Sequence, residues 1–324
     1  MRRSDFVIRR VVFALVTIFV ALSMNFVLFR AAPGDAVAAL RCTQCSAEFR
    51  ASQREALGLD KPLIAQYGVY LRGLLHGDMG SSLRTEQPVT SEIWTPLKNT
   101  VPMVALGVAL ALVLGVATGL LAAWRRGTAV DRASTWSALT LNSLPPQWLG
   151  LLMVLFAAGW FGLPSSGLDD PTLDVLGDAS TWEVVADRIE HMLLPSLTLA
   201  LVIYGSFTLV VRSALLETLG EDYVLTARAK GLSNWRVISR HAFRNALLPL
   251  VTAGALMLGL VVGGTITIEY VFSYPGIGLR AVEAIDQRDW PVLEGVFLVV
   301  TTTVIVANLL VDLLHLKLDP RVTA

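Results

Sequence analysis

The stretch that decides the fold is EDYVLTARAKGLSNWRVISRHAFRNALLPL, which runs from Glu221 to Leu250 between two long apolar runs. Asp222 can cap a first short helix, and Arg228 and Lys230 suit the negatively polarised C-terminal end of that helix. Gly231 can adopt the left-handed conformation that stops a helix. The pattern therefore predicts a first helix that stops at Gly231 and is followed by a second.

The second arm of this hairpin is predicted to be a helix over Asn234–Asn245, with Ser233 as its N-cap. Its apolar side chains fall on one face: Val237, Ile238 and Ala242. Its cations recur every four residues on another face: Arg236, Arg240 and Arg244. A long cationic hairpin between two apolar runs indicates a surface on which a partner docks.

The composition places the chain in a membrane. Mean hydropathy is +0.60, and charged residues make up 16% of the chain, whereas a soluble domain averages about 25%. A membrane span needs roughly 20 apolar residues. Six runs are long enough: Val11–Phe29, Val101–Trp124, Trp136–Phe161, Met192–Val211, Ala246–Ile268 and Pro291–Leu314. We therefore expect an all-α integral membrane fold with six transmembrane helices.

The distribution of Lys and Arg predicts the orientation of these helices. The cations concentrate in four regions: 1–10, 125–132, 212–244 and 317–321. The alternate short segments, 162–191 and 269–290, carry only Arg188, Arg280 and Arg288. Cytoplasmic loops are richer in Lys and Arg than loops on the other side. Both termini and the hairpin are thus expected in the cytoplasm, in a multi-pass membrane protein.

The segment 31–100 is predicted to be an extracytoplasmic domain between the first and second spans. Within it, Lys61–Leu75 has the pattern of an amphipathic helix with Pro62 at its first turn. The first span is expected to remain as a signal anchor, because its apolar run is longer than that of a signal peptide. The predicted domains are the N-terminal helix 1–30, the outside domain 31–100, and a five-helix core 101–324 with the hairpin loop at 221–249.

The outside domain holds both cysteines of the chain, Cys42 and Cys45. Such a pair can form a tight disulfide, stay as two thiols or supply half of a metal site. The four histidines are scattered: His76, His191, His241 and His315. We therefore expect no metal site and leave the disulfide and the free thiols open.

Polar residues inside the predicted spans are candidates for the lining of a pathway, since they are costly there. Asn142 and Asn308 are the main candidates, although a single Asn can also simply join two helices. Pro145 and Pro146 are expected to break the third span, and both are pathway candidates too because a broken helix can line a cavity. Asp312, near the cytoplasmic end of the sixth span, is expected to pair with a cation from a loop.

The loop Tyr270–Asp289 contains a turn, Tyr274-Pro275-Gly276, with an aromatic side chain that we expect to be exposed. Tyr274, Arg288 and Asp289 are candidates for contact with a docking protein on the outside. Alternatively, Tyr274 anchors the loop at the membrane interface.

Several segments of the chain resemble one family. TARAKG (Thr226–Gly231), followed by RNALLP (Arg244–Pro249), resembles the cytoplasmic coupling loop of ABC-importer permeases of the dipeptide/oligopeptide/nickel branch. The general motif of those permeases begins with an acidic residue, and here Leu225 takes that position. Further segments resemble the same branch in the same order: APGDAV (32–37), LGLDKPLIAQYGVYLRGLLHGDMGSSL (57–83), VFSYPGIG (271–278), RDWPVLEG (288–295) and LDPR (318–321).

The resemblance implies a transport subunit without catalytic residues in a bacterial or archaeal cytoplasmic membrane, which pairs with a homologous second permease. It also implies two cytoplasmic ATPase subunits that bind ATP and Mg, and an extracytoplasmic substrate-binding protein, in contact with membrane lipid and not with nucleic acid. Short peptides are the implied cargo, and nickel, haem or oligosaccharide remain alternatives. The residues implied to couple the chain to the ATPases are Asp222, Thr226, Ala227, Arg228, Ala229, Lys230, Gly231, Arg236 and Arg240.

Missing motifs support a role as a subunit that depends on a partner for energy. A phosphate-binding loop needs Gly-Lys followed by Ser or Thr, and none of the four lysines follows a Gly. A self-contained channel or ion-coupled transporter stays as the alternative, although the spans lack repeated charges or a filter-like loop. An intramembrane enzyme would need a nucleophile with a base at depth, and His191 and His315 lie only at span ends.

Overall fold

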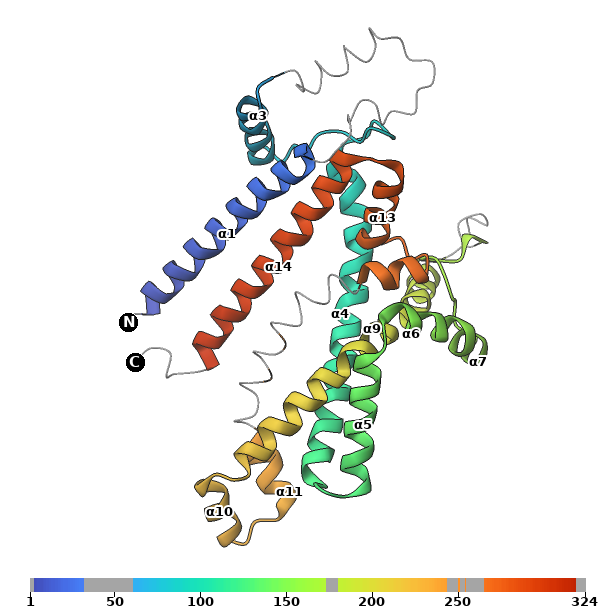
Figure 1. Ribbon diagram of the computed structural model, residues 1–324. Helices are drawn as coiled ribbons and strands as arrows, with labels where there is room; N and C mark the ends of the chain where they lie inside the picture. The colour runs from blue at the N-terminus through green and yellow to red at the C-terminus, as the bar shows by residue number, and fades with distance from the viewer. Residues whose placement is uncertain are drawn as a thin grey trace. The chain divides into compact units, whose positions relative to one another are not determined.

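The computed structural model describes residues 3–31, 61–172, 180–243, 250, 254 and 265–318. Throughout these residues the regular structure is helical, apart from one isolated bridge between Ser81 and Pro88. The backbone forms two compact units, each built from separate stretches of the chain (Figure 1). Unit 1 comprises 1–12, 101–274 and 306–324, and unit 2 comprises 13–100 and 275–305.

The helices follow the chain order predicted from hydropathy. The long ones are α1 (Arg3–Ala31), α4 (Val89–Trp124), α9 (Thr181–Thr218) and α14 (Trp290–Leu318). The shorter ones are α3 (Leu63–Leu75), α5 (Ala129–Ser143), α6 (Pro146–Leu152), the π-helix η1 (Met153–Ala157), α7 (Ala158–Phe161), α10 (Asp222–Ala229), α11 (Asn234–Arg236), the π-helix η2 (Val237–Ala242) and α13 (Ile277–Gln287).

Among the described residues, four helices are long and apolar enough to cross a membrane, and a fifth span is formed if α5 and α6–α7 count as one. These five correspond to the first, second, third, fourth and sixth predicted spans. The fifth predicted span, Ala246–Ile268, falls mostly outside the described residues. The all-helical fold is therefore confirmed, and the number of spans seen is four or five.

Two predicted spans are much shorter than the helices that contain them. The second was expected from Val101, but α4 begins at Val89. The fourth was expected from Met192, but α9 begins at Thr181, after a capping box in which Ser180 and Glu183 satisfy each other's backbone groups. An apolar window marks the part of a helix that suits lipid, whereas the helix itself continues until its backbone is capped.

The predicted break in the third span is confirmed. The helix axis turns by 105° between α5 and α6–α7, with Pro145 as the N-cap of α6 and Pro146 in its first turn. Proline cannot donate a backbone hydrogen bond and restricts the residue before it, so the helix ends here and a new one starts.

Unit 1 is built around α9, which packs along α5. Gly205 of α9 lies so close to the carbonyl oxygen of Ala138 in α5 that an added Cβ would collide with it. Arg212 of α9 also makes two hydrogen bonds to Asp131 of α5, of 2.7 and 3.1 Å. Close backbone packing and this ion pair join the two helices over most of the length of α5.

Unit 2 has its own apolar core between α4, α13 and α14, with Val89, Ile93, Ala284, Val292 and Val296 at its centre. The predicted amphipathic helix at Lys61–Leu75 is confirmed as α3, which starts after Pro62. The predicted domain limits at 30 and 100 stay a prediction, because the compact units are assembled from discontinuous stretches.

Candidate functional site

The basic hairpin of unit 1 has the helix–glycine–helix form predicted for it. It consists of α10, a turn at Gly231, α11 and η2. Gly231 has φ = 76°, the left-handed conformation expected of a helix-stopping glycine. The second arm was predicted as one α-helix over Asn234–Asn245. It is instead a short α-helical turn followed by a π-helix to Ala242, and Arg244–Pro249 lies outside the described residues.

A small apolar core fixes the shape of the hairpin. Val224 and Ala227 of α10 pack against Val237 of the second arm, with Leu219 and Leu232 beside them. The turn is closed by backbone hydrogen bonds from Lys230 to Thr226 (3.1 Å) and from Leu232 to Ala227 (3.4 Å). Val237, Ile238 and Ala242 are all buried, which confirms the apolar face predicted for the second arm.

The hairpin is firmly attached to the long helices of unit 1. Ile238 and Ala242 belong to the same apolar core as Ala214 and Leu215 of α9. Trp235 packs against Trp124 at the C-terminal end of α4, with 5.1 Å between the ring centroids and a tilt of 56° between the rings. The hairpin therefore packs against both α4 and α9.

The two turns of α10 present an exposed surface. Ala227 is only 6% exposed, whereas Leu225 is 57% exposed. The other described coupling candidates are exposed: Asp222, Thr226, Ala229, Lys230, Gly231 and Arg236. The side chains of Arg228 and Arg240 lie outside what the structure describes. Asp222 was expected to be the capping residue before α10, but it is the first residue of the helix itself.

The pathway candidates have different surroundings. Asn142 of α5 accepts a 2.8 Å hydrogen bond from the hydroxyl of Ser206 in α9, so it joins two helices of unit 1. Asn308 is exposed on α14. Pro145 is exposed and Pro146 half-buried at the bend after α5. Asp312 pairs with Arg10 at 2.8 Å, so its partner is a cation of the first helix and not of a loop. A pathway role for Asn142, Asn308 and the two prolines stays a prediction.

The expectation that Tyr274 is exposed was wrong. Its side chain is only 2% exposed and belongs to the core of unit 1, and its backbone N–H donates to the carbonyl oxygen of Glu269. Burial, followed by the nearby carboxylate of Glu269, raises the pKa of Tyr274 to about 12. A side chain in these surroundings neither anchors in lipid headgroups nor meets a docking protein.

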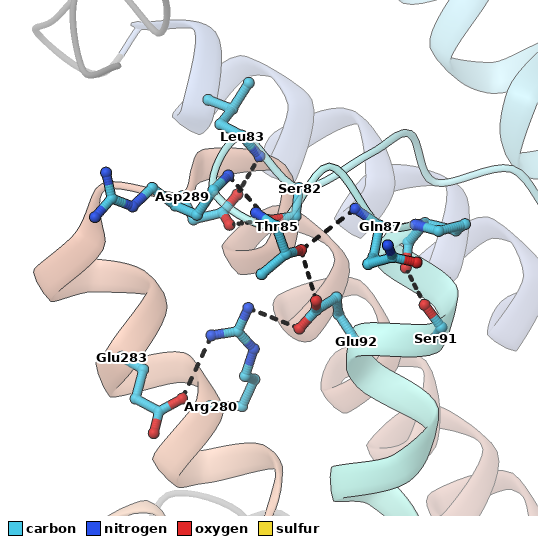
Figure 2. A network of polar contacts seen from close by, with 11 residues as sticks. Ser82, Leu83, Thr85, Gln87, Ser91, Glu92, Arg280, Glu283 and Asp289 are labelled. Atoms are coloured by element: carbon cyan, nitrogen blue, oxygen red, sulfur yellow. Dashed lines mark hydrogen bonds and ion pairs between the residues drawn. The ribbon is translucent and has the colours of Figure 1, made fainter. Parts of the chain in front are cut away.

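Asp289 is also buried, and it organises a polar network in unit 2 (Figure 2). Its carboxylate accepts hydrogen bonds from the Ser82 hydroxyl and from the backbone N–H of Leu83 (3.2 Å). Its own carbonyl accepts the N–H of Leu293 at the start of α14. Arg288, by contrast, is exposed and has φ = 55° at the end of α13.

A second part of this network was not foreseen from the sequence. Arg280 of α13 lies 2.8 Å from the carboxylate of Glu92 in α4, which also accepts from the Thr85 hydroxyl at 2.7 Å (Figure 2). For Asp289, the sequence did contain a signal of a structural role. The run Asp-Trp-Pro at 289–291 places Asp before a helix with Pro in its first turn, which is typical of an N-cap. No comparable local signal marks Arg280 and Glu92, which are far apart in the chain.

Cys42 and Cys45 lie outside the described residues, so their state stays open. Within the part of the chain that the structure describes, no three His, Cys, Asp or Glu side chains are grouped so that they could hold a metal ion.

Comparison with known proteins matches nearly the whole chain. Residues 115–324 match the family described as binding-protein-dependent transport system inner membrane component. Residues 3–104 match the family of the N-terminal part of such membrane components.

Individual relatives align over almost their full length. The chain is 37% identical to the dipeptide transport system permease protein DppB of Escherichia coli (strain K12), over 98% of each chain. It is 38% identical to the probable D,D-dipeptide transport system permease protein DdpB of the same strain, over 92% of each. It is 33% identical to the oligopeptide transport system permease protein AppB of Bacillus subtilis (strain 168), over 98% of this chain and 99% of AppB.

A solved structure shares the fold. A chain of the inward-facing MetNI methionine ABC transporter superposes with a TM-score of 0.53 and 19% sequence identity. The match covers 70% of this chain and 96% of that one.

Proposed function

The chain belongs to the binding-protein-dependent transport system inner membrane component family, and from this premise we propose that it forms half of the pathway through which an ATP-driven importer takes up short peptides. It is a permease, the transport subunit of an ABC system, and an inner membrane protein. Peptide cargo is supported by relatives that align over nearly the whole chain and are named as dipeptide and oligopeptide transport permeases.

The hairpin over Asp222–Ala242 is the observation that carries the proposal. It is rigid, because a small core and a left-handed glycine hold its arms together. It is exposed along α10, and it is attached to α4 and α9. A short helix laid into a groove of a partner is a common recognition mode, and a rigid attachment lets the partner's movement tilt the spans.

The family match implies partner subunits, and it supports the following proposed partners. Two cytoplasmic ATPase subunits supply the nucleotide site with its ATP and Mg, and one of them receives α10 in a groove. A homologous second permease completes the pathway, and an extracytoplasmic binding protein delivers the peptide. Of the three residues first considered for contact with that protein, only Arg288 keeps an exposed side chain, so the contact is assigned to Arg288.

The proposed topology has six spans with both termini and the hairpin in the cytoplasm. The run Ala246–Ile268 supplies the fifth span, between the hairpin and the loop before α13. The density of Lys and Arg around the hairpin and at both ends of the chain supports this orientation.

Uptake of labelled peptides tests the proposed function. Cells that carry the complete transporter should accumulate labelled di- and oligopeptides, and cells without this chain should not. A strain with the Ala227→Arg variant should also fail, since a charged side chain cannot fit among Val224, Val237 and Leu232. Equal uptake with and without the chain, at normal membrane levels of the partner subunits, would exclude peptide import.

A further inference from the structure

Helix α3 of unit 2 is fastened to the last turns of α1. The hydroxyl groups of Tyr67 and Ser23 are 2.6 Å apart, and the Phe26 ring lies 5.2 Å from the Tyr67 ring and 5.4 Å from the Tyr70 ring. Tyr67 and Tyr70 are three residues apart and thus share one face of α3. Figure 1 shows α3 beside the C-terminal end of α1.

The contact lies within the apolar length of α1, not beyond it. The membrane span in α1 extends from Ser4 to Arg30. With a rise of 1.5 Å per residue, Ser23 and Phe26 lie roughly 6 to 10 Å before Arg30 along the helix axis. The α1 side chains around this contact are exposed and apolar, including Phe19, Met24 and Val27. With Ser4–Arg30 across the membrane, α3 would meet α1 at a depth where lipid surrounds the protein.

A second face of α3 is apolar and mostly exposed, and only Leu71 of its four residues is half-buried. Ile64, Gly68, Leu71 and Leu75 follow the helical i, i+4, i+7, i+11 spacing, next to the tyrosine face. Ile64 is 84% exposed and Leu75 86% exposed, more than Met24 of α1 at 68%. Arg72 is exposed on the far flank of this stripe, where a long cationic side chain can reach headgroups.

We propose that α3 is an interfacial helix that lies in the membrane, with Ile64 and Leu75 inserted among the lipid acyl chains at the Arg30 end of α1. At 13 residues, α3 is too short to span a bilayer. The apolar face of an interfacial helix is buried roughly 5–10 Å into the boundary between headgroups and acyl chains, which is the depth at which α3 meets α1. Continuity with the exposed apolar surface of α1 favours lipid over a protein as the occupant. On the orientation proposed above, this is the outer leaflet.

The insertion of α3 would tether the outer end of α1 to the bilayer surface. The Tyr67–Ser23 and tyrosine–Phe26 contacts transmit this constraint to α1. The inference depends on the membrane location of α1 and not on the identity of the cargo. A failure of the peptide-import proposal would therefore leave it unaffected.

Fluorescence of an environment-sensitive label tests the proposal in the complete transporter reconstituted in lipid nanodiscs. Cys42 and Cys45 are first replaced by Ser, and single labels are then attached at Ile64→Cys and Leu75→Cys. Ala65→Cys is the matched control, because Ala65 is exposed on the side of α3 opposite the tyrosine face. Phe19→Cys reports a position within the span of α1.

The expected result is blue-shifted emission at Ile64 and Leu75, with loss of fluorescence when the nanodiscs contain phospholipid spin-labelled near the headgroup end of the acyl chain. Ala65 should stay accessible to a water-soluble quencher. Water accessibility at all three α3 positions would overturn the proposal. Blue-shifted emission that spin-labelled lipid does not quench would overturn it too, since a protein would then cover the stripe.

Discussion

Leu225 and Ala227 lie two positions apart on α10 and have opposite surroundings. Ala227 is buried in the small core of the hairpin, whereas Leu225 is among the exposed residues. A single exposed leucine is ordinary on a protein surface, so the position of Leu225 in the motif, and not its exposure, is the informative feature. The position that holds an acidic residue in the general coupling motif is thus apolar here, and we expect it to meet an apolar part of the ATPase groove.

The Leu225→Asp substitution should weaken docking of the ATPase while leaving the hairpin folded. The reason is that Leu225 contributes contact surface and no internal packing. We expect less ATPase to co-purify with the variant permease, measured as the subunit ratio after detergent extraction. Ile285→Asp, at another exposed apolar position, is the control and should leave the ratio unchanged. An unchanged ratio for Leu225→Asp would remove this residue from the docking surface.

Asp289 illustrates a charged residue whose role is internal. Its carboxylate satisfies the Ser82 hydroxyl and the Leu83 N–H. In Asp289→Ala these donors lose a buried acceptor, which costs about 1–3 kcal/mol. We expect a lower thermal unfolding temperature of the purified complex for Asp289→Ala, smaller loss for Asp289→Asn, and none for the exposed Asp286→Ala. Equal temperatures for Asp289→Ala and Asp286→Ala would show that the network adds nothing to stability.

The hairpin depends on its turn more than on the strength of either short arm. Both arms are too short to be stable alone in water, so they form because their apolar residues meet. For these residues to meet, the chain must reverse at Gly231, which is in the left-handed conformation. An L-residue in that conformation costs roughly 1–2 kcal/mol, whereas glycine has no Cβ to clash.

The effect of replacing Gly231 on uptake should therefore depend on whether the new residue tolerates the left-handed conformation, and not on its size. Space around the glycine is open, because no atom lies within 4 Å of an added Cβ. Gly231→Val should reduce peptide uptake strongly, and Gly231→Asn should preserve most of it, since Asn tolerates the left-handed region. Uptake and membrane level of both variants are measured together. Similar uptake for the two would mean that the turn does not need this conformation.

The α5–α9 pair depends on close backbone contact. Gly205→Ala would place a Cβ against the carbonyl oxygen of Ala138, and overpacking of this kind costs about 1–3 kcal/mol. We expect a lower unfolding temperature for the purified Gly205→Ala complex. Gly159→Ala in α7 is the matched control, since an added Cβ there meets nothing within 4 Å. No difference between the two variants would indicate that α5 and α9 separate easily to accommodate the methyl group.

At the scale of the whole molecule, orientation in the membrane is set by where the cations lie. The hairpin, both termini and the segment after α4 share the positive charge, and the segments before α9 and α14 do not. The positive-inside rule therefore acts on several loops in the same sense, and a single added charge should not reverse the topology.

Labelling of single cysteines in intact cells tests this orientation. In a background with Cys42 and Cys45 replaced by Ser, a membrane-impermeant maleimide should react with Glu283→Cys of α13 and not with Lys230→Cys of the hairpin. Both positions are exposed, so accessibility in the folded chain is matched. After the membrane is permeabilised, both should react. The reverse pattern in intact cells would invert the proposed topology.

Local patterns in the sequence determined the membrane class, the order of the helices, the bend at Pro145 and Pro146, and the turn at Gly231. Hydropathy, proline geometry and glycine conformation all act within a few residues of the chain, so they can be recognised without a structure. The buried face of the second arm, Val237, Ile238 and Ala242, was predictable for the same reason, because helical spacing alone defines it.

Tertiary structure alone decided which polar and aromatic residues are buried. From their local sequence, Tyr274 and Asp289 were predicted to be exposed. Asp289 instead accepts a hydrogen bond from Ser82, 207 positions away in the sequence, and Tyr274 lies in the core of unit 1. Burial of a polar group is tolerated only where distant residues supply its hydrogen bonds, and a local pattern carries no information about those partners. The full lengths of α4 and α9 follow the same principle, since Val89 and Ile93 pack in the core at the start of α4 and a capping box fixes the start of α9.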